Sequence, residues 1–128
     1  MDKILLYSAA FFTMIWGTAH LFPTKSVVLN FGDISTDNRQ IITMEWLIEG
    51  IALIFTGCLT GLVTYLDYRN EISQVVFLIS AIFLFLLAAI SFFTGFRIAF
   101  LPYKLCPFIF SFSGILILIG GVFHGAGF

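Results

Sequence analysis

The chain alternates long apolar runs with short polar breaks, a pattern that predicts membrane-spanning helices. Four apolar runs extend over about residues 4–22, 41–66, 73–95 and 105–123. A hydrocarbon core about 30 Å thick needs roughly 20 apolar residues per helix, whereas a spanning strand needs only about 9–11. The pattern therefore predicts an all-α integral membrane protein: four transmembrane helices in an antiparallel up-down bundle, forming one domain over residues 1–128.

The first apolar run has some features of a signal peptide, because Lys3 precedes it and small residues occupy positions 8–10. However, the run continues to Pro23, beyond the roughly 7–15 residues of a signal-peptide core. We interpret it as a retained first helix. With four spanning helices, both termini are expected on the same side of the membrane.

The composition supports a membrane protein and excludes some functions. Hydrophobic residues make up 60% of the chain and charged residues 10%, with a mean hydropathy of +1.08. These values lie outside the range of soluble domains. The formal net charge is -1 and no basic run is present, so nucleic-acid binding is not expected. Cys58 and Cys106 should lie about 25 Å apart along the membrane normal, too far for a disulfide.

The segment 23–40 is long for a connection between two helices and is about half apolar. It could lie in the headgroup region or form a lid. Asp37, followed three residues later by Gln40, is predicted to cap the second helix.

Two glutamates, Glu45 and Glu49, interrupt the second apolar run. On insertion scales a carboxylate at a helix centre costs about 2.5–3.5 kcal/mol, so the pair requires a partner, a proton or water. Their spacing of four residues places both on one helix face, in line with Thr56, Thr60 and Thr64. This pair marks the candidate site.

The other helices carry similar polar stripes, which are expected to face the interior of the bundle. They comprise Thr13, Gly17 and His20 in the first helix, Ser80, Ser91 and Thr94 in the third, and Ser113, Gly120 and His124 in the fourth. Serine and threonine in membrane helices often bond the carbonyl four residues earlier, which is the interpretation we favour for each of them singly.

His20 ends the first helix at the level where Glu45 and Glu49 begin the second, and Arg97 leaves the third helix at the same level. We therefore expect His20, Glu45, Glu49 and Arg97 to converge. Trp46 and Trp16 would be aromatic walls of this site. His124 should lie a membrane thickness away, outside it.

Three interpretations of this cluster remain open. Arg97 and His20 could neutralise the glutamates and hold the helices together, as in a non-enzymatic structural or accessory subunit of a membrane complex. The carboxylates could instead bind a lipophilic or amphipathic small molecule, or exchange a proton with it, as in a membrane isomerase or other acid-base enzyme using Glu45, Glu49 or His20. Finally, His20, Glu45 and Glu49 could ligate a divalent metal ion, although Glu-x-x-x-Glu is a weak metal motif. No cofactor is expected.

Gly57 and Gly61 have the spacing of a GxxxG motif, which allows another helix to approach closely. The approaching helix could belong to the same chain or to a second copy in a homodimer.

The segment Gly17-Thr-Ala-His-Leu-Phe-Pro23, the polar loop and the helix containing Glu45 and Glu49-Gly50 together resemble the small four-helix bacterial membrane proteins of the DoxX-like group. The resemblance implies a multi-pass protein of the bacterial inner membrane, surrounded by lipids. It also implies a loose association with redox or sulfur-linked membrane complexes and little specific chemistry.

Overall fold

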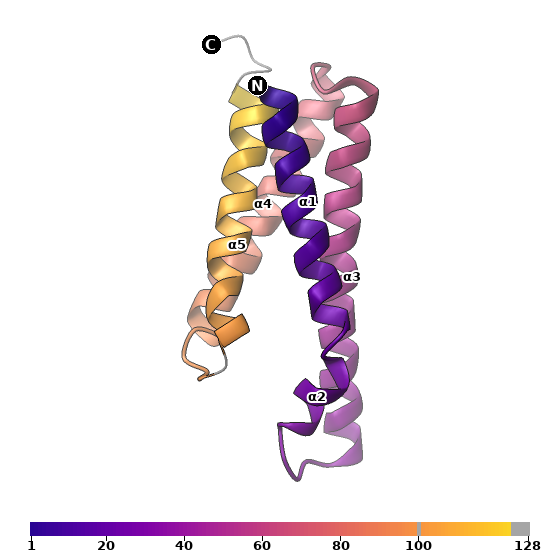
Figure 1. Cartoon of the computed structure of the whole chain (residues 1–128), viewed down its shortest axis with the longest axis vertical. Coiled ribbons are helices and arrows are strands. Elements are labelled where there is room, and N and C mark those ends of the chain that lie inside the picture. Colours follow the sequence, from indigo (N-terminus) through magenta and orange to yellow (C-terminus); the bar gives the residue numbers. More distant parts are fainter. Residues whose placement is uncertain (100, 124–128) are drawn as a thin grey trace.

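The computed structural model describes residues 1–99 and 101–123. Its helices are α1 (Asp2–Leu21), α2 (Thr24–Leu29), α3 (Thr36–Asp67), α4 (Glu71–Thr94), α5 (Leu101–Ile117) and the π-helical segment η1 (Leu118–Phe123), which continues α5 (Figure 1). Of the described residues, 86% are helical and none lies in a strand.

Four helical segments in this part of the chain are long and apolar enough to cross a membrane. They are Asp2–Leu21, Thr36–Asp67, Glu71–Thr94 and Leu101–Phe123. The prediction of an all-helical protein with four candidate spans is therefore confirmed.

The segment between the first two spans differs from the sequence-based expectation. It contains the short helix α2, and α3 already begins at Thr36 rather than near residue 41. The prediction that Asp37 caps this helix is wrong, because Ser35 is the N-cap and its hydroxyl accepts from the Asn38 backbone N–H at 3.2 Å. Asp37 instead lies in the first helical turn, where its charge favours the helix dipole.

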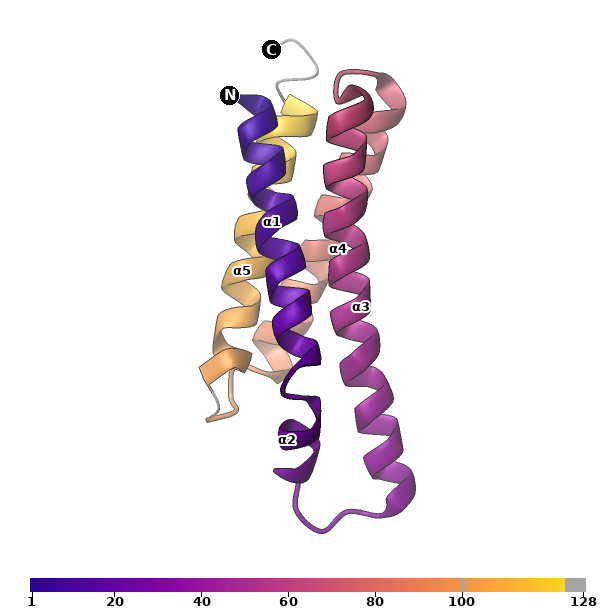
Figure 2. The ribbon, with the colours of Figure 1, turned by 45° about the vertical axis from the view of Figure 1, so that its right-hand side comes forward.

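The helices associate as two pairs, α1 with α3 and α4 with α5. Figures 1 and 2 show that α3 extends past the α4–α5 connection, towards α2. At the opposite end, η1 packs against both α1 and α4.

Small residues bring the helices together at the end where η1 lies. A Cβ on Gly120 would stand 2.9 Å from the Asp2 carbonyl oxygen, and one on Gly121 would overlap the Phe77 side chain. Four large side chains in this part of the bundle are fully buried, and with Gly120 and Gly121 they define what we call the closed half: Leu6, Phe77, Leu84 and Ile117.

The pair α1 and α3 is held by contacts between backbones. A Cβ on Gly17 would lie 2.7 Å from the Gly50 carbonyl oxygen, and one on Gly57 would lie 2.8 Å from the Ala10 carbonyl oxygen. A Cβ on Gly61 would meet only the Ala10 methyl group, at an ordinary 3.7 Å. Both glycines of the GxxxG motif thus face α1 of the same chain, and a homodimer through them stays a prediction.

The buried threonines satisfy their own hydroxyl groups. Thr13 donates to the Ala9 carbonyl at 2.7 Å, and the same four-residue spacing recurs for Thr56, Thr60 and Thr64. This confirms that these hydroxyls bond the preceding helical turn. These threonines therefore require no ligand. The buried Ser113 hydroxyl, by contrast, has no hydrogen-bond partner among the described residues, so it does not bond the preceding turn as expected.

Candidate ligand-binding site

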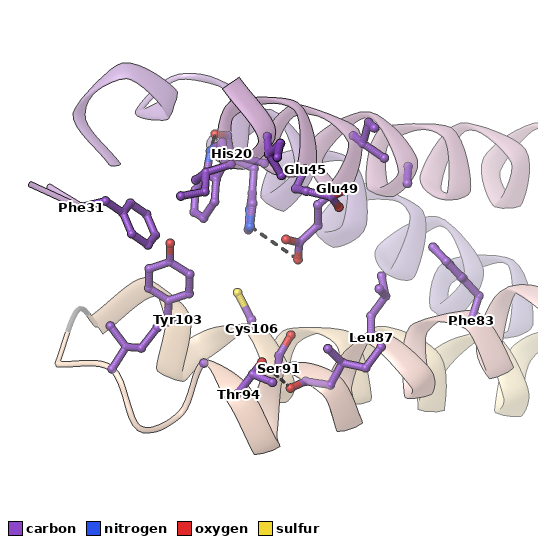
Figure 3. A pocket seen from close by; sticks show the side chains of 18 residues that line it. His20, Phe31, Glu45, Glu49, Phe83, Leu87, Ser91, Thr94, Tyr103 and Cys106 are labelled. Atoms are coloured by element: carbon purple, nitrogen blue, oxygen red, sulfur yellow. Dashed lines mark hydrogen bonds and ion pairs between the residues drawn. The ribbon is translucent and has the colours of Figure 1, made fainter. Parts of the chain in front are cut away.

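A cavity of about 540 Å³ lies between the α1–α3 pair and the α4–α5 pair (Figure 3). We call it the open-end cavity, because it lies at the end remote from η1. Its wall includes His20 of α1, seven residues of α3 between Ile41 and Ala52, five residues of α4 between Phe83 and Thr94, and two residues of α5, Tyr103 and Cys106. Phe31, from the segment between α2 and α3, also contributes.

His20 and Glu49 form the polar centre of this wall. The His20 Nε2 atom lies 3.7 Å from Glu49 Oε1, and the side chains are 5% and 32% exposed. On its other side, His20 Nδ1 lies 3.3 Å from the Trp16 carbonyl oxygen. The imidazole is therefore positioned between its own helix and the carboxylate of α3.

Both tryptophans contact His20. Trp46 stacks on the imidazole with ring centroids 4.6 Å apart and planes 24° apart, and its indole N–H donates to the His20 carbonyl. Trp16 meets the same imidazole edge-on, with centroids 6.1 Å apart. Of the two expected aromatic walls, Trp46 lines the open-end cavity, whereas Trp16 does not. The stacked rings fix the orientation of His20 and hence its approach to Glu49.

Glu45 lies one turn before Glu49, is exposed, and also lines the cavity. Among the described residues it has no ion-pair or hydrogen-bond partner. Its carboxylate therefore contributes an unneutralised charge to this wall.

The structure does not bring Arg97 to the glutamates. The helix α4 ends at Thr94, and the chain turns at the buried Gly95, which packs near the Tyr103 ring. Arg97 follows on the exposed connection, lies off the cavity wall, and makes no ion pair with a described carboxylate. Among the basic residues that the structure describes, only His20 approaches a glutamate.

A metal site receives no support from this geometry. Within residues 1–99 and 101–123, no group of three or more histidine, cysteine, aspartate or glutamate side chains is placed to hold a metal ion. His124, which the sequence placed away from this site, lies outside the described residues.

On the second wall of the cavity, Ser91 and Thr94 of α4 belong to a stripe that the sequence predicted to face the interior, but the sequence did not identify the α5 residues. The Tyr103 ring meets Trp46 edge-on, with centroids 5.5 Å apart, and Cys106 directs its sulfur towards the cavity (Figure 3). The three-residue spacing of Tyr103 and Cys106 places them on one helix face, which is the signal that could have identified them. Cys106 is buried, Cys58 is exposed and both are free thiols, which confirms that they form no disulfide.

Comparison with protein-family models, with curated proteins and with solved structures found no match. The DoxX-like resemblance therefore stays a prediction.

Proposed function

We propose that this protein is a multi-pass membrane protein that binds a lipophilic or amphipathic small molecule in the open-end cavity. The observation that carries the proposal is the cavity itself, in which the His20–Glu49 pair meets a mainly apolar wall. Small-molecule sites typically have volumes of about 300–1,000 Å³, mostly apolar walls and a few placed polar groups. A cavity of about 540 Å³ fits this description.

We further propose that the four candidate spans cross the membrane as an antiparallel up-down bundle. The order of close contacts supports opposite directions for α1 and α3, because Gly17 meets Gly50 whereas Ala10 meets Gly57. The outer face of α4 supports contact with lipid, since its large apolar side chains are exposed, among them Ile72, Ile79 and Phe93.

The length of α3 suggests where the glutamates lie in the bilayer. Its 32 residues extend about 48 Å, well beyond a hydrocarbon core of about 30 Å. Roughly 20 residues counted back from Leu66 reach Leu47, which would place Glu49 just inside the hydrocarbon boundary and Glu45 at headgroup level. At this depth ionised carboxylates cost far less than at the bilayer centre, and the polar part of an amphipathic molecule resides there.

A purely structural role for the polar cluster explains less of the site. The His20–Glu49 contact does link α1 to α3, as that interpretation requires. However, Glu45 has no described partner, and the cavity continues past the pair to Phe83 and Leu87 of α4. Two helices could be linked without leaving this space.

The proposal can be tested with tryptophan fluorescence, because the chain has two tryptophans and Trp46 lies on the cavity wall. In the Trp16→Phe background, Trp46 reports alone. We would titrate the protein, in zwitterionic lipid nanodiscs, with three compounds that share a dodecyl chain brominated at carbon 6, near enough to the head group for the bromine to reach Trp46: 6-bromododecanol, 6-bromododecanoate and (6-bromododecyl)trimethylammonium. Bound bromine quenches the indole, so at least one compound should quench Trp46 saturably.

Filling the cavity provides the control. Ala52→Phe, on the cavity wall, should abolish the saturable quenching, whereas Val75→Phe, on the exposed face of α4, should leave it unchanged. If all three compounds quench Ala52→Phe and the parent alike, quenching comes from the surrounding lipid and the proposal is wrong.

A further inference from the structure

We infer that the ligand of the open-end cavity is a single-chain amphiphile with a positively charged head group. This inference rests on the proposed function and specifies the chemical class of the ligand. It follows from the charges, the aromatic rings and the apolar region of the cavity wall.

The charges on the wall are unbalanced. Glu45 and Glu49 line the cavity, His20 is the one basic side chain among the lining residues, and lysine and arginine are absent from that set. The wall thus carries two acidic side chains and one basic side chain. This excess of acidic groups favours a cation over an anion.

The lysines and arginines closest in sequence to the lining residues do not neutralise the acidic side chains of the wall. Arg39 donates to the Gly32 carbonyl at 3.4 Å, outside the cavity wall. Lys25 and Arg97 are exposed, and neither they nor Lys104 line the cavity. No described lysine or arginine therefore neutralises Glu45, and its carboxylate is available to a positively charged ligand.

Aromatic rings surround the acidic part of the cavity. Phe31 and Tyr103 lie near each other at one end of it (Figure 3). Trp46, which contacts Tyr103, also lines the cavity. One face of Trp46 is covered by His20, and Tyr103 meets Trp46 edge-on, so the rings are held in fixed orientations. Aromatic faces attract alkylammonium groups within about 6 Å of the ring centroid, which adds to the attraction of the carboxylates.

The other end of the cavity is apolar. Beyond Glu49, Phe83 and Leu87 of α4 form the wall away from Phe31 and Tyr103 (Figure 3). A hydrocarbon chain can lie here while its head group remains among the carboxylates and rings. The cavity thus has an acidic end that suits the head group and an apolar end that suits the hydrocarbon chain.

The three brominated dodecyl compounds test this inference because they differ in head-group charge and share one chain. In zwitterionic nanodiscs, we expect the trimethylammonium compound to bind Trp16→Phe protein at least about tenfold more tightly than the carboxylate, with the neutral alcohol between them. Glu49→Gln should weaken trimethylammonium binding about tenfold and leave alcohol binding nearly unchanged. Glu45→Gln should act in the same direction, and Glu71→Gln, on the exposed start of α4, should have no effect.

The outcomes separate this inference from the proposed function. Retained alcohol binding by Glu49→Gln shows that the variant is folded and its cavity intact. If the three compounds bind equally tightly, or the carboxylate binds best, the cavity is a ligand site but the inference of a cationic ligand is overturned. If no compound quenches saturably, the proposed function fails and this inference fails with it.

Discussion

The closed half and the open-end cavity are built by the same four long helices, yet they differ in how these helices meet. In the closed half, Gly121 packs directly against Phe77, and Leu6 and Ile117 are fully buried. Towards the other end, the α4–α5 pair separates from the α1–α3 pair, and the space between them forms the cavity. Polar groups follow the same division, since the closed half contains self-bonded threonines and the cavity contains carboxylates and an imidazole. The tightly packed core and the cavity with its ionisable side chains thus lie at different ends of one bundle.

The largest expected difference between the two halves is the cost of removing a leucine. Leu84 is fully buried in the core, whereas Leu87, on the same helix, lines the cavity. Leu84→Ala should destabilise the protein by at least about 2 kcal/mol, because it opens a void among packed side chains. Leu87→Ala should cost about 1 kcal/mol or less, because one side of Leu87 already faces space. Reversible denaturation in mixed micelles measures both, and equal costs would remove the distinction between the halves.

Gly121→Ala tests the close approach that defines the closed half. The new methyl group would overlap the Phe77 side chain, so we expect a loss of about 1–3 kcal/mol in the free energy of unfolding. Gly61→Ala is the matched control, since its methyl group would meet the Ala10 methyl at an ordinary distance. That variant should remain within about 0.5 kcal/mol of the parent. Chemical denaturation should give Gly121→Ala a lower unfolding midpoint than Gly61→Ala. Equal midpoints would contradict the close packing of Gly121 against Phe77.

His20→Ala measures how much the contacts of His20 contribute to the free energy of unfolding. The substitution removes the stack on Trp46 and the contact with Glu49, for an expected cost of about 1 kcal/mol. His20→Phe restores a ring that can stack, and should recover most of that stability without restoring the contact with Glu49. A His20→Phe protein as unstable as His20→Ala would instead assign the stability to the ion pair. Thermal unfolding in detergent distinguishes these outcomes.

Thr60→Val should have the smallest effect. The Thr60 hydroxyl donates at 2.8 Å to the Thr56 carbonyl within one helix, so its loss should change the free energy of unfolding by about 0.5 kcal/mol or less. Trp46→Phe offers a comparison, because the Trp46 indole donates to the His20 carbonyl on a different helix. Loss of this hydrogen bond should lower the free energy of unfolding by about 1 kcal/mol. A larger effect for Thr60→Val would show that the closed half depends on its polar groups after all.

Much of the fold could be predicted because the relevant signals are local. The lengths of the apolar runs gave the four candidate spans, and helical periodicity placed Thr13, Thr60 and His20 on buried faces. The start of α3 was harder to predict, because the choice between Ser35 and Asp37 as N-cap depends on the path of the preceding chain. The helix α2 was missed for a related reason. Its six residues are too short for a clear period, and its buried Val27 and Val28 acquire their role by packing near α3.

The candidate site was predictable for the α1–α3 wall and for Ser91 and Thr94 of α4, but not for its α5 residues. His20, Trp46 and Glu49 share a level because α1 and α3 are adjacent in sequence and pack closely, and this follows from helix lengths alone. The position of Arg97 depends on a turn after α4, which directs it outwards. The spacing of Tyr103 and Cys106 could show that they share a helix face, but their place on the cavity wall depends on the separation of the two helix pairs at one end, which is a property of the whole packing.

The glycine contacts between α1 and α3 determine which wall of the cavity can move. Where backbone touches backbone, as between Gly17 and Gly50, no rotamer change can open or close the contact. We therefore expect the α1–α3 pair, with His20 and Glu49, to move as one unit. A hinge motion of α4 and α5 about their contacts in the closed half would then change the cavity volume. On this view Tyr103 and Cys106 lie on the wall that moves, and the separation of the two walls would set the size of a molecule that the cavity could hold.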